Sequence, residues 1–301
     1  KRLASLDSQR ARSPRERAEA NIAAIRTLKT LDGNGDEPLS AEQTDTLRGY
    51  SGWGGCADAF SDKPEWADLN AEIRELLDDD EYTQARASTL TAYYTPGPVV
   101  KAMWDALDIG SAPIQVLEPG CGTGNFMAGI PENIKANVSG VELDPISARI
   151  AAALNPDATI LNADLADCTI HPGFDLTIGN VPYSGDISLD YRTTDGGTSR
   201  LPLHDYFIER SVDALRPGGV AMLLTSRYTL DKRSETMRAD LARKAELVGA
   251  VRLPSSTFAR QAGTGPSPTC SFCADANGRS TARPTRRGST PIRSPCPDTR
   301  T

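Results

Sequence analysis

Residues 1–90 show the spacing of apolar positions at every third and fourth residue that is typical of amphipathic helices. One helix is predicted over residues 10–31 and a second over residues 64–82, each with charged side chains on its opposite face. The apolar positions of the two predicted helices are Ala18, Ile22, Ile25 and Leu28, then Trp66, Leu69, Ile73, Leu76 and Leu77. A glycine-rich segment at residues 49–55 separates the two helices. We interpret residues 1–90 as a helical N-terminal arm.

From residue 114 the pattern changes to short apolar runs that alternate with helical segments. The runs lie at residues 115–117, 138–143, 159–161, 174–178, 220–224 and 247–251. Short apolar runs separated by crossover helices are typical of a parallel sheet that is buried on both faces. The predicted fold class is therefore α/β, a doubly wound parallel sheet that follows the helical arm.

Composition and charge narrow the class of protein. The chain has 301 residues, 39% of them hydrophobic and 24% charged, which suits one α/β domain with a smaller appendage. No apolar run approaches the roughly 18 residues of a membrane helix, and the N-terminus lacks the apolar core of a secretory leader. Six scattered cysteines form no disulfide framework. We therefore expect a cytoplasmic protein, without a metal site because only two histidines are present.

Candidate chemistry gathers at the ends of the predicted strands. Glu118 ends the first strand, and the glycines that follow it allow a tight turn beneath a ligand. Glu142 ends the second strand, at the position where an acid accepts hydrogen bonds from a ribose diol. Asp164 follows the third strand, where its carboxylate can accept a hydrogen bond from an adenine amino group. Together these strand ends predict an adenosine-like ligand.

The fourth strand runs into Asn180, Val181, Pro182 and Tyr183, and at this point the chain resembles a known family. The motifs that carry the resemblance are Tyr94-Thr-Pro96, Glu118-Pro-x-Cys-Gly-x-Gly124, Gly140-Val-Glu-Leu-Asp-Pro145, Ala163-Asp164 and Asn180-x-Pro-Tyr183. Over residues 91–264 they resemble the amino-group DNA methyltransferases of the adenine-N6 kind, in gamma motif order. With residues 50–55 included, the chain is most similar to the methylase portion of phage- and plasmid-type methylase-helicase fusion proteins.

The resemblance implies a Rossmann-like class I methyltransferase domain with S-adenosyl-L-methionine as cofactor. By motif position, Thr95 and Glu118 are implied near the methionine end of the cofactor, Glu142 at its ribose and Asp164 at its adenine. The full set of residues implied in cofactor binding is Thr95, Glu118, Gly120, Gly122, Gly124, Phe126, Glu142 and Asp164.

The turn at residues 180–183 carries the predicted catalytic residues. Because the lone pair of adenine N6 is delocalised into the ring, a catalyst must accept hydrogen bonds from both hydrogens of the amino group. The side-chain carbonyl of Asn180 accepts one, and the backbone carbonyl of Val181, where the family more often has Pro, accepts the other. Pro182 fixes the chain direction. Tyr183 offers an aromatic face to a base flipped out of the duplex.

The C-terminal tail, residues 265–301, breaks the α/β pattern. It is rich in Pro, Ser, Thr and Arg and has a net charge of +4, against −11 for the rest of the chain. We expect a disordered basic tail and a methyltransferase sheet whose final antiparallel strand is missing, which exposes an apolar edge and makes folding marginal. A back-translation of residues 266–278 read two nucleotides later permits a strand-like peptide. Our hypothesis is that the reading frame shifts near codon 265.

We predict a site-specific DNA adenine-N6 methyltransferase of the restriction-modification type. The same turn can serve other planar amines and amides, so methylation of a glutamine amide or an RNA base is an alternative. A nonenzymatic or degenerate module that binds DNA or cofactor for a helicase is a second alternative, which the net charge of −7 favours. Expected partners are DNA and a helicase or target-recognition domain or subunit. Residues 184–202 are a candidate DNA-facing loop, and Trp53 is interpreted as packed between helices.

Overall fold

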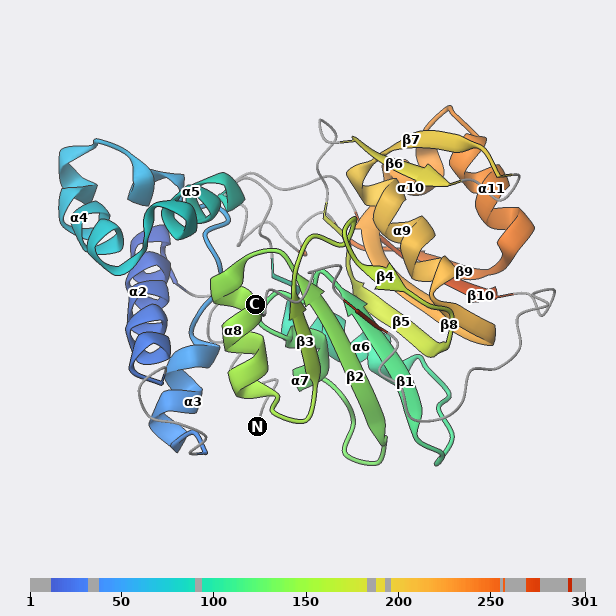
Figure 1. The fold of residues 1–301 in the computed structure, drawn as a ribbon, viewed down its shortest axis with the longest axis horizontal. Helices are drawn as coiled ribbons and strands as arrows, with labels where there is room; N and C mark the ends of the chain where they lie inside the picture. Colours follow the sequence, from blue (N-terminus) through green and yellow to red (C-terminus); the bar gives the residue numbers. More distant parts are fainter. Residues whose placement is uncertain are drawn as a thin grey trace, which may run out of the picture.

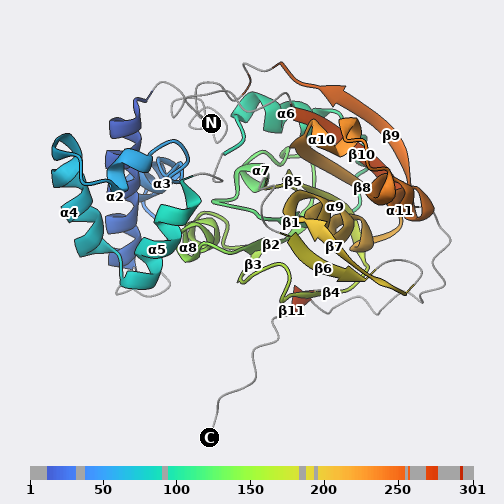
Figure 2. The ribbon, with the colours of Figure 1, turned by 90° about the horizontal axis from the view of Figure 1, so that it is seen from above.

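The computed structural model describes residues 12–31, 38–89, 94–182, 188–192, 196–254, 257, 269–276 and 292–293. In this part of the chain, a helical arm lies beside a seven-stranded sheet that carries helices on its faces (Figure 1). Seen from above, helix α8 (Pro145–Leu154) lies between the arm and the sheet (Figure 2). The α/β class and the helical arm expected from the sequence are confirmed.

The arm contains more helices than the apolar spacing predicts. Its elements are α2 (Pro14–Leu31), α3 (Ala41–Arg48), η2 (Ala57–Phe60), η3 (Pro64–Trp66), α4 (Ala67–Leu76) and α5 (Asp79–Ser88). The single helix predicted over residues 64–82 is divided at Leu77, because the carboxylate of Asp78 accepts the N–H of Glu81 and starts a new helix. Ser40 and Gln43 form the same kind of capping box at the start of α3.

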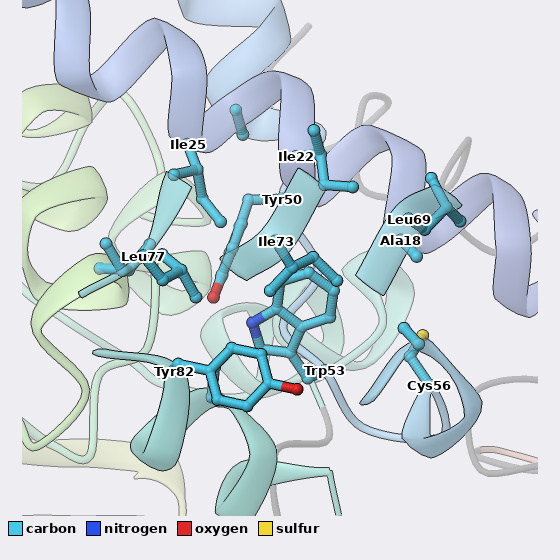
Figure 3. Packing of buried hydrophobic residues seen from close by; sticks show 14 of the residues in the cluster. Ala18, Ile22, Ile25, Tyr50, Trp53, Cys56, Leu69, Ile73, Leu77 and Tyr82 are labelled. Atoms are coloured by element: carbon cyan, nitrogen blue, oxygen red, sulfur yellow. The ribbon is translucent and has the colours of Figure 1, made fainter. Parts of the chain in front are cut away.

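The arm has a hydrophobic core of its own (Figure 3). The predicted face of α2 is buried in this core, and it meets Leu69 and Ile73 of α4. Trp53 is 1% exposed and lies edge-on to the ring of Phe60, with 4.9 Å between the ring centroids. Ile146 and Ile150 of α8 belong to the same cluster. The arm is therefore packed onto the α/β part of the molecule, and Trp53 is an inter-helix packing residue, as interpreted from the sequence.

The sheet has the strand order β3-β2-β1-β5-β8-β10-β9. Its strands are β1 (Ile114–Pro119), β2 (Ala136–Glu142), β3 (Thr159–Asn162), β5 (Phe174–Asn180), β8 (Leu215–Ser226), β9 (Ala245–Arg252) and β10 (Thr269–Ala276). The five strands β3, β2, β1, β5 and β8 are parallel to one another. The strand order reverses between β1 and β5, which is where open α/β sheets hold ligands at the carboxyl ends of their strands.

Alternate residues along the central strands face opposite layers of helices. Val116 and Met222 belong to the cluster that contains α6 (Gly97–Asp105) and α7 (Asn125–Ala128). The following residue in each strand, Leu117 or Leu223, belongs to a cluster on the other face, which α9 (Leu203–Asp213) and α11 (Thr236–Lys244) cover. Two-sided burial explains why these strands appear in the sequence as continuous apolar runs.

The expectation that the final antiparallel strand is missing is wrong. Strand β10, which lies inside the tail, pairs antiparallel with β8 on one side and with β9 on the other. Two strands with unpaired backbone groups accept any extended segment that offers N–H and C=O groups, and residues 269–276 contain neither Pro nor Gly. The predicted disorder is therefore also wrong for these residues, and for β11 (Ile292–Arg293), which pairs with β4 (Thr169–Ile170).

The polar stretch expected as a loop at residues 184–202 contains a hairpin. Its strands β6 (Ser188–Arg192) and β7 (Thr198–Pro202) pair antiparallel and lead directly into α9. A short helix, α10 (Tyr228–Asp231), follows β8.

Among the residues that the structure describes, no helix combines the length and the apolar character needed to span a bilayer.

Candidate active site

The glycine turn after β1 is a left-handed backbone turn fixed to the neighbouring strand. Gly120, Gly122 and Gly124 have φ values of 70°, 54° and 82°, a region that residues with a Cβ rarely adopt. The N–H groups of Gly120 and Cys121 both donate to the carbonyl of Val141 on β2, at 2.8 and 2.9 Å. The turn is therefore held at the carboxyl edge of the sheet, where the sequence predicts it.

Glu142 at the end of β2 joins this turn through its side chain. Its two carboxylate oxygens accept the N–H of Gly122 at 2.7 Å and the N–H of Asp144 at 2.9 Å. Burial raises the pKa of Glu142 to about 7, against the lowering effect of these hydrogen bonds. A carboxylate has about four acceptor positions, so Glu142 retains the capacity to accept hydrogen bonds from ribose hydroxyls.

Glu118 and Thr95 place unpartnered polar atoms in the same region. Glu118 is 3% exposed and Thr95 is 4% exposed. The N–H groups of Phe126 and Met127 donate to the carboxylate of Glu118, and burial raises its pKa well above the ordinary range. One oxygen of Glu118 and the hydroxyl of Thr95 have no hydrogen-bond partner among the described residues. A buried polar atom without a partner costs about 1–3 kcal/mol, so both positions fit groups that bind a polar ligand.

The other predicted cofactor residues lie in two kinds of environment. Asp164 follows β3, is partly buried, and accepts the N–H of Ala166 at 2.8 Å in a tight turn. Phe126 is 3% exposed and packs in the hydrophobic cluster beneath the turn, where its carbonyl accepts the indole N–H of Trp104 at 2.9 Å. The side chain of Phe126 is thus part of the core that supports the turn.

The predicted catalytic turn begins where β5 ends, beside β1. Asn180 is the last residue of β5 and is partly exposed. The N–H of Val181 donates to the carbonyl of Leu224 on β8 at 3.0 Å, which fixes the turn on its other side. Pro182 is partly exposed, and Tyr183 lies outside the described residues. The topology brings residues 180–182 and the glycine turn to the same edge of the sheet, on adjacent parallel strands.

Tyr94 is a residue at this site that the sequence-based assignment leaves out. Its ring lies against the glycine turn, since a Cβ built on Gly122 would be 3.0 Å from it. Its hydroxyl is 2.9 Å from the hydroxyl of Ser147 at the start of α8. In the sequence, only its position next to Thr95 could have indicated Tyr94. The residues that it contacts, Gly122 and Ser147, lie far from it along the chain.

Solved structures identify the fold. A Listeria monocytogenes protein described as a class I S-adenosylmethionine-dependent methyltransferase superposes with a TM-score of 0.50 at 15% identity, covering 89% of this chain and 91% of that one. The chain has the class I methyltransferase fold. S-adenosyl-L-methionine is the cofactor that this fold implies. The methyltransferase subunit of a Streptococcus thermophilus type I restriction-modification system superposes with a TM-score of 0.52 at 16% identity, covering 85% and 66% of the two chains.

Curated relatives confirm the resemblance to restriction-modification methyltransferases. Defense against restriction protein B of Escherichia phage P1 is 30% identical over an alignment of 256 positions that covers 81% of this chain. Type II methyltransferase M.XamI of Xanthomonas campestris pv. amaranthicola is 28% identical over 48% of the chain. A Methanocaldococcus jannaschii protein described as a protein N5-glutamine methyltransferase is 28% identical over 46% of the chain and 75% of its own length.

The chain corresponds to only part of the first two of these relatives. It spans 10% of the phage protein and 32% of M.XamI. No protein-family model matches the chain. Among the described residues, no group of three or more His, Cys, Asp or Glu side chains is arranged to hold a metal ion.

Proposed function

We propose that this methyltransferase domain transfers a methyl group from S-adenosyl-L-methionine to the N6 amino group of adenine in DNA. The observation that supports the proposal is the position of Asn180 at the end of β5, next to the strand that leads into Glu118 and the glycine turn, which we assign to the cofactor. Adjacent carboxyl strand ends bring a methyl donor and an acceptor together, as an in-line displacement requires.

In this proposal the protein positions both reactants and polarises the acceptor. The cofactor supplies an activated methyl group when bound. Thr95 and Glu118 hold its methionine end, Glu142 its ribose, and Asp164 its adenine. Asn180 and the carbonyl of Val181 accept hydrogen bonds from the two amino hydrogens of the target base, which increases electron density on N6. Tyr183 stacks on the flipped base and offsets part of the unstacking cost of a few kcal/mol.

We place sequence recognition outside the sheet. The hairpin β6–β7 is the next described element after the proposed catalytic turn and is the candidate DNA-facing element of this chain. Because the chain spans 10% of the phage relative, a further domain or a partner, such as a helicase or target-recognition subunit, has room to supply the remaining DNA contacts.

Methyl transfer to DNA tests the proposal. The chain is incubated with labelled S-adenosyl-L-methionine and unmethylated DNA, beside the variants Asn180→Ala and Asn137→Ala. Asn137 is an exposed residue of β2 away from its carboxyl end and serves as the matched control. We expect label on adenine N6 with the wild-type chain and the control, and a loss of about 100-fold or more with Asn180→Ala.

Two results would contradict the proposal. Equal rates for the wild type and Asn180→Ala would remove Asn180 from the reaction. A soluble chain that binds the cofactor but labels no DNA would point to a nonenzymatic binding module.

A second candidate is methylation of a glutamine amide. The match to the Methanocaldococcus jannaschii protein favours it, and a planar amide presents the same two hydrogens to Asn180 and Val181 as an adenine amino group. The same assay with glutamine-containing peptides in place of DNA separates the two substrates. Label found only on the peptide amide would replace the DNA proposal.

A further inference from the structure

The glycine-rich segment of the arm, residues 49–55, has no role in the function proposed above, yet buried polar side chains of α2 hold it in place. The side-chain amide of Asn21, which is 0% exposed, donates to the carbonyl of Gly52 at 2.7 Å and accepts the N–H of Ser51 at 2.9 Å. Arg17, 7% exposed, donates to the carbonyls of Gly54 and Gly55 at 3.1 and 3.3 Å. The backbone of the segment is therefore fixed relative to α2.

The fixed backbone of segment 49–55 lies against the ring of Tyr94. Gly52 has a φ of 67°, and a Cβ built there would lie 2.5 Å from Cε2 of the Tyr94 ring, a separation that real side chains do not show. On the other edge of the ring, a Cβ on Gly122 would lie 3.0 Å from Cε1. Tyr94 is thus enclosed by one glycine of the arm and one glycine of the cofactor turn, and both glycines have positive φ.

The hydroxyl end of Tyr94 is held as well. The Ser147 hydroxyl donates to Asp144 Oδ2 at 2.5 Å, so its oxygen accepts the hydrogen of Tyr94 at 2.9 Å. Tyr50 belongs to segment 49–55 and is buried, and its hydroxyl is visible in Figure 3. This side chain also forms a hydrogen bond with Ser147. The N–H of Asp144 in turn donates to Glu142.

These contacts form a closed ring of interactions around the glycine turn at residues 120–124. It runs from the Tyr94 hydroxyl through Ser147 and Asp144 to Glu142, and the second carboxylate oxygen of Glu142 accepts the N–H of Gly122 at 2.7 Å. Gly122 lies against the ring of Tyr94, which completes the ring of interactions. A shift of the Tyr94 ring would therefore change the positions of Gly122 and Glu142, and of Thr95, which follows Tyr94 in the chain.

We propose that Tyr94 is a positioning residue through which segment 49–55 of the arm sets the shape of the cofactor site. The arm is then part of the cofactor-binding unit, and the affinity for the cofactor depends on the contact between Gly52 and Tyr94. This inference rests only on the cofactor part of the proposed function, and it holds whether the methyl acceptor is DNA or a glutamine amide.

Cofactor binding without turnover tests this inference. The dissociation constant for S-adenosylhomocysteine is measured by titration calorimetry for the wild-type chain and for Gly52→Ala, Tyr94→Phe, Tyr94→Ala and Gly173→Ala. Gly173 is the matched control, because a Cβ there meets no atom within 4 Å. Circular dichroism and thermal unfolding report on folding in each case.

We expect Gly52→Ala and Tyr94→Ala to raise the dissociation constant at least tenfold and Gly173→Ala to leave it within twofold. Tyr94→Phe keeps the ring, so it restores most of the affinity lost in Tyr94→Ala, while its pH profile of binding shifts because the link to Ser147 and Glu142 is lost. A merely structural residue would not shift that profile.

Unchanged affinity in folded Gly52→Ala, or in both Tyr94 variants, would overturn the inference, as would a wild-type chain that binds no cofactor. If Gly52→Ala does not fold, the two Tyr94 variants decide the result. Failure of the proposed methyl transfer is a separate outcome, recognised by normal cofactor binding without labelled product.

Discussion

At the scale of single residues, the buried carboxyl group of Glu142 holds the glycine turn by accepting the N–H of Gly122, and we propose that it also accepts hydrogen bonds from the cofactor ribose. Its hydrogen bonds to backbone N–H groups favour the charged form, but burial outweighs them and raises the pKa to about 7. Without cofactor, the folded chain therefore binds the Glu142 proton more tightly than the unfolded chain does. The contribution of this proton to the free energy of unfolding is lost as the pH rises from about 4.5 to about 7.

The pH dependence of cofactor binding follows from this pKa. In the proposed site the ribose hydroxyls donate to the carboxylate form of Glu142, so binding requires loss of the proton, and the affinity should rise about tenfold between pH 6 and 8 and then level off. Calorimetric titration with S-adenosylhomocysteine across this range measures the effect. The variant Glu142→Gln should bind more weakly and lose this part of the pH dependence, and a pH profile shared by both proteins would contradict the assignment.

At the scale of elements, strand β10 decides whether the sheet is complete. It is hydrogen-bonded on both sides, to β8 and to β9, although its sequence lies in a tail of Pro, Ser, Thr and Arg. Proline inside a strand paired on both sides removes a ladder hydrogen bond and is poorly tolerated there.

Ser271→Pro should therefore destabilise the folded chain by about 3 kcal/mol or more, because Ser271 pairs with Leu224 on one side and Val251 on the other. Urea unfolding followed by tryptophan fluorescence measures the change. The control Thr269→Pro, at the first residue of the strand and opposite Ser226 alone, should cost much less. Equal stability of Ser271→Pro and the wild type would mean that β10 does not close the sheet.

At the scale of the whole molecule, the outer edge of the sheet at β9 is the least covered apolar surface among the described residues. Leu247, Val248 and Val251 are 51%, 65% and 61% exposed. At the opposite edge, α8 lies beside β3 and the arm packs on α8, so the two ends of the sheet differ in their protection (Figure 1). An exposed apolar edge strand is prone to pair with another chain.

Val248→Lys should reduce concentration-dependent self-association without changing the affinity for S-adenosylhomocysteine, because a lysine at a sheet edge opposes strand pairing and β9 is not part of the cofactor site. Sedimentation velocity over a series of concentrations, with calorimetry beside it, measures both properties. Lys101→Arg, on the surface of α6, is the control, a surface substitution that leaves the charge of the chain unchanged. Association that is equal in the two variants would show that this edge is already protected.

The sequence by itself determined the elements whose signals are local. Short apolar runs marked β1, β2, β3, β5, β8 and β9, and the regular spacing of Ile22, Ile25 and Leu28 marked α2. The glycines and acids at strand ends could be placed at one edge because parallel strands share their carboxyl ends. The division of the second predicted helix was missed, since one Asp78 cap outweighed a continuous apolar face.

Only the tertiary structure decided which distant backbones become neighbours. Residues 269–276 carry a weak strand signal and form β10 because β8 and β9 leave unpaired hydrogen-bonding groups on either side of them. The contact of Gly52 with Tyr94 likewise depends on the packing of the arm against α8, which no local pattern encodes. Local periodicity specifies the elements and the residues at their ends, whereas the partners of those residues are set by packing in three dimensions.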